Sequence, residues 1–77
     1  MASKLTLRYD RDADILYISS SPPSPEQETE ELGDDIIARL NPETGGVESL
    51  EVLFFSARLQ RGGLFELPVT ADLHRAG

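Results

Sequence analysis

The feature that most constrains the fold is a pair of apolar runs near the start of the chain, separated by a short polar turn. Residues 5–9 alternate between apolar and polar side chains, which is the period of a β-strand with one buried face. Residues 10–14 contain three aspartates, which favour turns because their carboxylates hydrogen-bond to nearby backbone. Residues 15–18 are apolar throughout. The pattern predicts an antiparallel β-hairpin over residues 5–18.

A second hairpin and a short helix are predicted further along the chain. Residues 35–40 and 47–54 predict two strands, with Leu50, Val52 and Phe54 sharing one face of the second. The turn between the two strands contains a proline and two glycines, which suit the dihedral angles of tight turns. Residues 55–61 predict one or two helical turns, and the glycine pair that follows ends them.

The expected fold class is therefore α+β and mainly β. Two consecutive hairpins would form a four-stranded antiparallel sheet, and the short helix would cover one of its faces. Residues 64–69 are compatible with a short fifth strand. Pro68 restricts that strand to an edge of the sheet, because proline has no backbone donor for a second neighbour.

Length and local composition predict a single small domain over residues 1–77. Residues 19–33 are expected to form a mobile loop, because prolines and serines come first and acidic residues follow with no basic residue among them. Residues 70–77 are expected to be a frayed tail. No apolar run is as long as a membrane span and no signal peptide opens the chain, so a soluble, cytoplasmic protein without membrane partners is expected.

Charge and residue content exclude several classes of function. With 14 acidic and seven basic residues, the net charge is −7, which disfavours direct binding of nucleic acid because phosphates would be repelled. The chain contains no cysteine and a single histidine, His74, so disulfides, thiolate zinc sites and imidazole-rich metal sites are excluded. No cofactor is expected. An acidic surface suits solubility or a basic protein partner.

The aspartates of the first turn have the spacing that opens a calcium loop. Asp10, Asp12 and Asp14 would be its first ligands. Such a loop needs a glycine at its sixth position and a glutamate at its twelfth, and here those positions are Ile15 and Ser21. A plain turn is the favoured interpretation, and no metal site is predicted.

No other group of residues has the spacing of a catalytic site. Glu48 and Glu51 lie three positions apart on a strand, so they point to opposite faces. Either could form an acid–base pair with Asp34 or Asp35 of the neighbouring strand. Salt bridges to arginines are, however, the favoured interpretation of these carboxylates. No serine has a base at hand, because the only histidine lies in the tail. No catalytic residue is predicted.

Self-association is expected because the core is small. A domain of this length buries only roughly 60% of the surface of its unfolded chain. Two of the predicted strands are apolar on both faces, and one short helix cannot cover both. A homodimer is therefore predicted, with Leu53, Phe54 and Phe55 as interface residues. Leu53 and Phe54 would lie on opposite faces, one in the core and one in the interface.

Four blocks of the sequence stand out, namely Tyr9-Asp10-x-x-Ala13-Asp14-x-Leu16-Tyr17-Ile18, Ile36-Ile37, Gly46-Val47-x-x-Leu50-Glu51-Val52-Leu53 and Phe55-Ser56. Together they resemble the domain of unknown function 2283 family of small bacterial proteins. The resemblance covers about residues 4 to 60, and an Asn41–Thr44 turn stands where the family has an aspartate-rich one. The family supports the predicted fold without supplying an activity. Some members resemble antitoxins encoded beside basic, nuclease-like partners.

Two classes of function follow from these observations. The favoured class is a non-catalytic, acidic protein-interaction module, of which an antitoxin-like protein that masks a basic partner is one form. The alternative is a small enzyme or ligand-binding domain that uses carboxylates at the strand ends. The interaction module is favoured because no group of residues meets the needs of catalysis.

Overall fold

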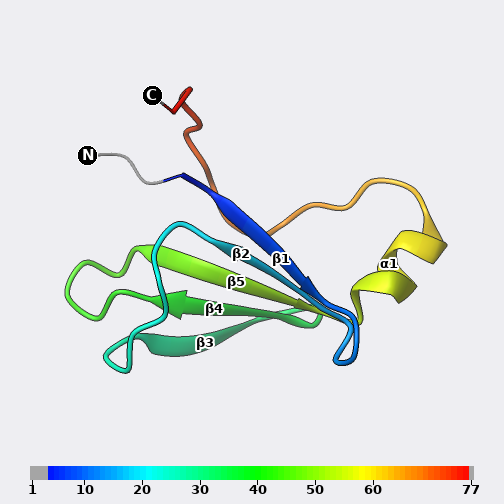
Figure 1. Cartoon of the computed structure of the whole chain (residues 1–77), viewed down its shortest axis with the longest axis horizontal. Helices are drawn as coiled ribbons and strands as arrows, with labels where there is room; N and C mark the ends of the chain where they lie inside the picture. The colour runs from blue at the N-terminus through cyan, green and yellow to red at the C-terminus, as the bar shows by residue number, and fades with distance from the viewer. Residues whose placement is uncertain (1–3, 77) are drawn as a thin grey trace.

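The protein is built on one antiparallel β-sheet, followed by a short helix (Figure 1). The computed structural model describes residues 4–76. The strand order across the sheet is β1-β2-β5-β4-β3, and every neighbouring pair is antiparallel. The elements are β1 (Thr6–Asp10), β2 (Ile15–Ser19), β3 (Glu28–Gly33), β4 (Ile36–Leu40), β5 (Val47–Leu53) and α1 (Phe55–Arg61).

Both predicted hairpins are present, and side chains in their turns explain why they form. The Asp10 carboxylate accepts hydrogen bonds from the backbone N–H groups of Asp12 and Ala13, which closes the β1–β2 turn. The Asn41 side chain does the same for Glu43 and Thr44 between β4 and β5. β2 then pairs with β5, which joins the two hairpins into one sheet.

The sheet has five strands and not four, and the additional strand lies where a mobile loop was predicted. β3 pairs with β4 along most of its length, for example Glu30 with Ala38. Asp34 and Asp35 connect the two strands, and both have positive φ, 52° and 61°. Positive φ at both central residues is the geometry of a type I′ hairpin turn. Residues 64–69, the expected position of a fifth strand, form no strand.

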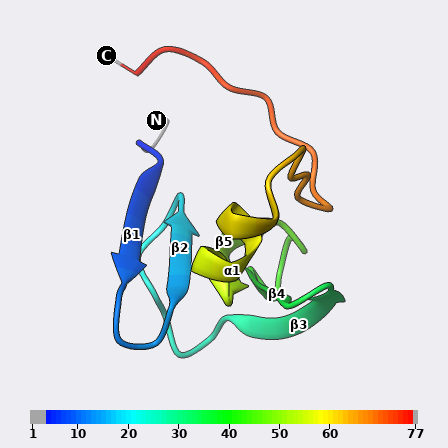
Figure 2. The same cartoon turned by 90° about the vertical axis from the view of Figure 1, so that its right-hand side faces the viewer.

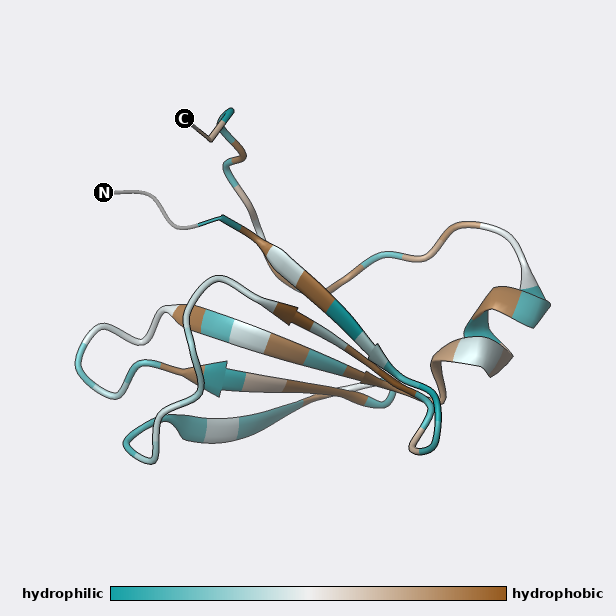
Figure 3. Ribbon diagram, viewed as in Figure 1, coloured by the Kyte–Doolittle hydropathy of each residue, from teal (hydrophilic) through white to brown (hydrophobic). Residues whose placement is uncertain are grey.

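The two faces of the sheet differ in polarity, and hydrophobic and hydrophilic residues alternate along the strands (Figure 3). The apolar face carries the core, which is centred on β4 and β5. Leu67 and Val69 from the segment after α1 pack against this core. Its buried apolar residues are Ile36, Ala38, Leu50 and Val52.

The predicted helix is confirmed, but it does not cover a face of the sheet. α1 follows the end of β5 and lies at that end of the sheet, and none of its residues is buried (Figure 1). The chain then returns from α1 past the sheet (Figure 2). Leu67 and Val69 of this returning segment cover part of the core.

Candidate functional site

Three of the four carboxylates considered above, those of Asp34, Glu48 and Glu51, have side-chain partners within the protein. Glu51 accepts a hydrogen bond from Arg39 Nε at 2.7 Å, and Asp34 pairs with Arg58 Nη1 at 3.1 Å. The two oxygens of Glu48 accept from the side-chain amides of Gln27 and Asn41. These donors lower the pKa of Glu48, with Gln27 the larger cause.

Asp14 binds the start of α1, although it lies in the distant β1–β2 turn. One carboxylate oxygen accepts from the Tyr9 hydroxyl at 2.6 Å and from the Ser56 backbone N–H at 2.9 Å. The other oxygen accepts from the Ser56 hydroxyl at 2.7 Å, and the Asp14 carbonyl accepts from Phe55 N–H. The residue before the helix, Phe54, offers no side-chain cap. Asp14 therefore supplies the cap from another part of the chain.

The hydrogen bonds to Asp14 set its charge state. Donation by the Tyr9 hydroxyl, then by the Ser56 hydroxyl and N–H, lowers the pKa of Asp14. The same hydrogen bond raises the pKa of Tyr9, because an ionised tyrosine could not donate to the carboxylate. Tyr9 also packs against Phe55, with ring centroids 5.8 Å apart. A carboxylate with a lowered pKa and three donors is suited to holding structure and not to moving protons at neutral pH.

The calcium interpretation gains no support from this geometry. Asp10 binds the backbone of its own turn, and Asp14 is directed at α1. Within residues 4–76, no three histidine, aspartate or glutamate side chains are grouped so that they could hold a metal ion.

Arg58 links α1 to two other parts of the chain. Its side chain is only 7% exposed, and its guanidinium lies 4.6 Å from the centre of the Phe65 ring. Its ion pair with Asp34 joins the helix to the β3–β4 turn. Among the residues that the structure describes, Nε and Nη2 of Arg58 have no hydrogen-bond partner.

The predicted interface residues do not occupy equivalent positions. Leu53 ends β5 on the polar face, opposite Ile15, and is partly buried. Phe55 is partly buried against Tyr9. Phe54 does not continue the strand as predicted, because its φ of 54° turns the chain into α1 and leaves the side chain 58% exposed.

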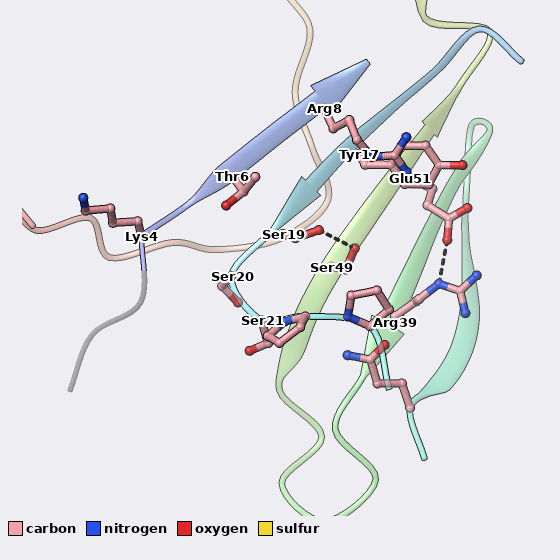
Figure 4. Close-up of a pocket in the computed structure, with 13 residues that line it drawn as sticks. Lys4, Thr6, Arg8, Tyr17, Ser19, Ser20, Ser21, Arg39, Ser49 and Glu51 are labelled. Atoms are coloured by element: carbon pink, nitrogen blue, oxygen red, sulfur yellow. Dashed lines mark hydrogen bonds and ion pairs between the residues drawn. The ribbon is translucent and has the colours of Figure 1, made fainter. Parts of the chain in front are cut away.

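A trough of about 710 Å³ lies on the polar face of the sheet (Figure 4). Strands β1, β2, β5 and β4 contribute to it, and the loop after β2 forms one side. Sequence reasoning missed this site, because its residues come from strands whose order in the sheet differs from their order in the chain. The side chains discussed below are Lys4, Thr6, Arg8, Tyr17, Ser19, Arg39, Ser49 and Glu51.

The trough is locally basic on an acidic protein. Lys4, Arg8 and Arg39 line it, which is three of the seven basic residues in the chain. Glu51 is the one acidic residue among its lining side chains, and it is paired with Arg39. Arg8 lies over the ring of Tyr17, 4.2 Å from its centre, and forms no ion pair with any residue in 4–76.

The fold and these sites define a small antiparallel sheet protein in which the β1–β2 turn is hydrogen-bonded to the start of α1. The chain matches the family model described as Protein of unknown function (DUF2283) over residues 6–56, which is more than half of its length. It therefore belongs to that family, as its sequence blocks predicted. No curated protein and no solved structure matches it significantly. The described part of the chain contains no helix long and apolar enough to cross a membrane.

Proposed function

We propose that this protein is a non-catalytic interaction module and that its edge strand β3 binds a basic segment of another protein. The observation that carries the proposal is the combination of an open strand edge with exposed carboxylates. β3 lies at the end of the sheet, so one side of its backbone pairs with β4, and the other side pairs with no strand within residues 4–76. Glu28, Glu30 and Glu31 on this strand are all exposed.

The arrangement of these carboxylates matches an added strand. Glu28 and Glu30 share one face of β3, because they lie opposite Leu40 and Ala38, and Glu31 lies on the other face. An extended peptide that pairs with an edge strand gains backbone hydrogen bonds, while its alternate side chains give specificity. Lysine or arginine side chains on either face of such a peptide would meet a carboxylate.

Charge also selects against the wrong partner. Two copies of β3 would bring like charges together, so the acidic edge disfavours pairing of this chain with itself. A basic strand would instead be attracted to the acidic edge of β3. Such attraction increases the rate of association and fixes the register of the two strands. A basic partner protein, including the masked partner of an antitoxin-like module, has the required chemistry.

The competing function, an enzyme that uses strand-end carboxylates, has less support. Asp14, Glu26 and Glu48 have lowered pKa values, because side-chain donors bind each of them; the first-ranked donors are Tyr9, Ser24 and Gln27. A general acid at neutral pH needs a raised pKa instead. Asp34 and Glu51 are held in ion pairs with arginines. These contacts favour the interaction module.

The test is an NMR titration with a synthetic peptide in which lysine alternates with valine. We expect saturable shifts of β3 amide signals and no such shifts with a peptide in which glutamate replaces lysine. Changing Glu28, Glu30 and Glu31 to glutamine should weaken binding about tenfold, because each exposed pair contributes roughly 0.2–1 kcal/mol.

A matched control removes three charges elsewhere. Glu43, Glu66 and Asp72 are exposed and lie outside β3, so Glu43→Gln, Glu66→Gln and Asp72→Asn together should leave the affinity within about twofold. Equal weakening in both triple variants would refute a specific edge site. Shifts confined to other strands would refute it as well.

A further inference from the structure

We propose that the trough on the polar face binds a small phosphate ester with hydroxyl groups, the chemistry of a sugar phosphate. This site is separate from the β3 edge and does not depend on the function proposed above. Its floor offers hydroxyl groups, and its rim offers Arg39, which is paired with Glu51, together with Arg8 and Lys4, which form no ion pair within the described residues (Figure 4).

The floor of the trough comes from one row of small residues across three strands. Thr6 lies opposite Ser19, and Ser19 lies opposite Ser49. Residues opposite each other in antiparallel strands project from the same face, so the three hydroxyl side chains stand side by side. Ser19 Oγ and Ser49 Oγ are 3.1 Å apart. Short side chains flanked by longer ones leave a depression, and hydroxyls can both donate to and accept from a sugar.

Longer side chains from the neighbouring row form a wall along this floor. Arg8 lies opposite Tyr17, and Tyr17 lies opposite Glu51. The ring of Tyr17 supports the guanidinium of Arg8, which keeps its N–H groups available without an internal carboxylate. Such a planar group forms paired hydrogen bonds with phosphate oxygens.

Arg39 and Lys4 add charge at other points of the rim. Arg39 is oriented by its hydrogen bond to Glu51, and a second, longer contact reaches Thr29 at 3.5 Å. Lys4 precedes β1 and pairs with no carboxylate in the described residues. The lining therefore carries three positive charges and one negative charge, on a chain whose net charge is −7.

The size and charge of the site indicate a small anion and not a polymer. A volume of about 710 Å³ is within the range of small-molecule sites. The acidic remainder of the chain would repel the long backbone of a nucleic acid, whereas a single phosphate group needs only the cations that line the trough. A phosphate ester uses both features of the trough, because the phosphate meets the cations and the hydroxyls meet the floor.

The experiment is an NMR titration of the full chain with ribose 5-phosphate, with ribose and inorganic phosphate as matched probes. We expect saturable shifts at Thr6, Arg8, Ser19 and Ser49 with ribose 5-phosphate. Ribose should give no saturable shifts, and inorganic phosphate should bind more weakly than the ester. Absence of saturable shifts with ribose 5-phosphate would overturn the proposal. Equal affinity for ribose, or for inorganic phosphate, would overturn the phosphate ester as the ligand class.

Two variants and a control locate the binding. Arg8→Gln should weaken ribose 5-phosphate binding about tenfold or more, because it removes a charge-assisted contact from an exposed edge position. Ser19→Leu should abolish binding by filling the floor. Arg11→Gln removes the same charge from the β1–β2 turn, outside the trough, and should leave the affinity unchanged. Equal effects of Arg8→Gln and Arg11→Gln would show attraction by overall charge and overturn the site.

Discussion

Asp14 is the residue whose contacts matter most to the fold, because it joins the first turn to the last helix. Its positive φ of 58° is tolerated by aspartate better than by most residues, and its carboxylate then faces Tyr9 and Ser56. Tyr9 and Asp14 belong to one family block and Ser56 to another that lies 42 residues from Asp14, and the two blocks meet in this cluster. A structural role explains these three residues without any catalysis.

Removing the Asp14 carboxylate should destabilise the protein. Asp14→Ala leaves the Ser56 N–H and two hydroxyls without an acceptor, so we expect the melting temperature to fall by about 5 °C or more. Asp14→Asn keeps one acceptor oxygen and should cost less. Thermal unfolding followed by circular dichroism measures both. Asp12→Ala is the control, because only the backbone N–H of Asp12 takes part in the turn; an equal loss in that variant would contradict the cap.

The same cluster predicts how stability depends on pH. Folding lowers the pKa of Asp14 below its unfolded value, which is near 3.8. The Asp14 carboxylate therefore stabilises the folded protein at pH values above 3.8, and this stabilisation is lost as pH falls through the lower pKa of the folded state. Folding raises the pKa of Tyr9 above its unfolded value of 10.0. The Tyr9 hydroxyl therefore stabilises the folded protein at pH values below 10.0, and this stabilisation is lost as pH rises through the higher pKa of the folded state.

Urea unfolding at a series of pH values tests both signs. Asp14→Asn should flatten the decline of stability on the acid side, and Tyr9→Phe should flatten the decline on the alkaline side. The neutral plateau should be lower in each variant, since each loses a hydrogen bond at every pH. Unchanged pH slopes in both variants would show that other groups control the titration.

At the scale of elements, β3 is the strand whose existence distinguishes the structure from the predicted loop. Leu32, the only aliphatic residue in β3, packs against the core, whereas the glutamates beside it face solvent. Leu32→Ala should therefore lower the melting temperature by about 5 °C, corresponding to roughly 1 kcal/mol for a partly buried leucine in a small domain. Leu64→Ala is the matched control, because Leu64 is 87% exposed. Identical melting temperatures for the wild type and Leu32→Ala would favour the mobile loop.

The strands that face the core could be predicted from the sequence, and the outer strand and the trough could not. Alternation of apolar and polar residues marks β1, and apolar runs mark β2 and the start of β4, although β1 remains largely exposed in the structure. β3 has solvent on both faces for most of its length, so its glutamates carry no period. The trough depends on the row Thr6–Ser19–Ser49, which exists only once β2 has paired with β5. Local patterns contain no information on that pairing.

Asp14 shows, for a single residue, which features local sequence patterns can predict and which they cannot. Its place in a turn could be predicted, because aspartates favour turns. Its contact with Ser56 spans 42 positions of the chain and depends on where β5 ends beside the first hairpin. The αL conformation of Phe54 sets that end, and no local preference predicts it because large aromatic residues rarely adopt positive φ.

At the scale of the whole molecule, the apolar face is only partly covered. Leu67 and Val69 pack on the core of β4 and β5, so the C-terminal segment protects part of the face that self-association was expected to bury. Leu7 and Tyr9 on β1 remain 61% and 42% exposed. Exposed apolar side chains gathered on an outer strand are a common feature of association surfaces.

Phe54 gives the sharper reason to expect a twofold dimer. Its side chain is 58% exposed, and its left-handed backbone is unfavourable for an aromatic residue. Asparagine adopts this conformation more readily, so contacts of the exposed aromatic ring are the expected benefit of phenylalanine at this position. Burial of the Phe54 side chain against a second copy of the protein would provide these contacts, and twofold symmetry is the commonest arrangement of two copies.

Phe54→Asn therefore separates association from folding. Sedimentation at low micromolar concentration should show a dimer for the wild type and a monomer for Phe54→Asn, and the circular dichroism spectrum of the variant should match that of the wild type. Leu64→Asn is the control, because this exposed residue lies outside the predicted interface and should leave the dimer intact. A dimeric Phe54→Asn would place the interface elsewhere. A monomeric wild type would mean that the segment carrying Leu67 and Val69 covers enough of the apolar face for the chain to remain alone in solution.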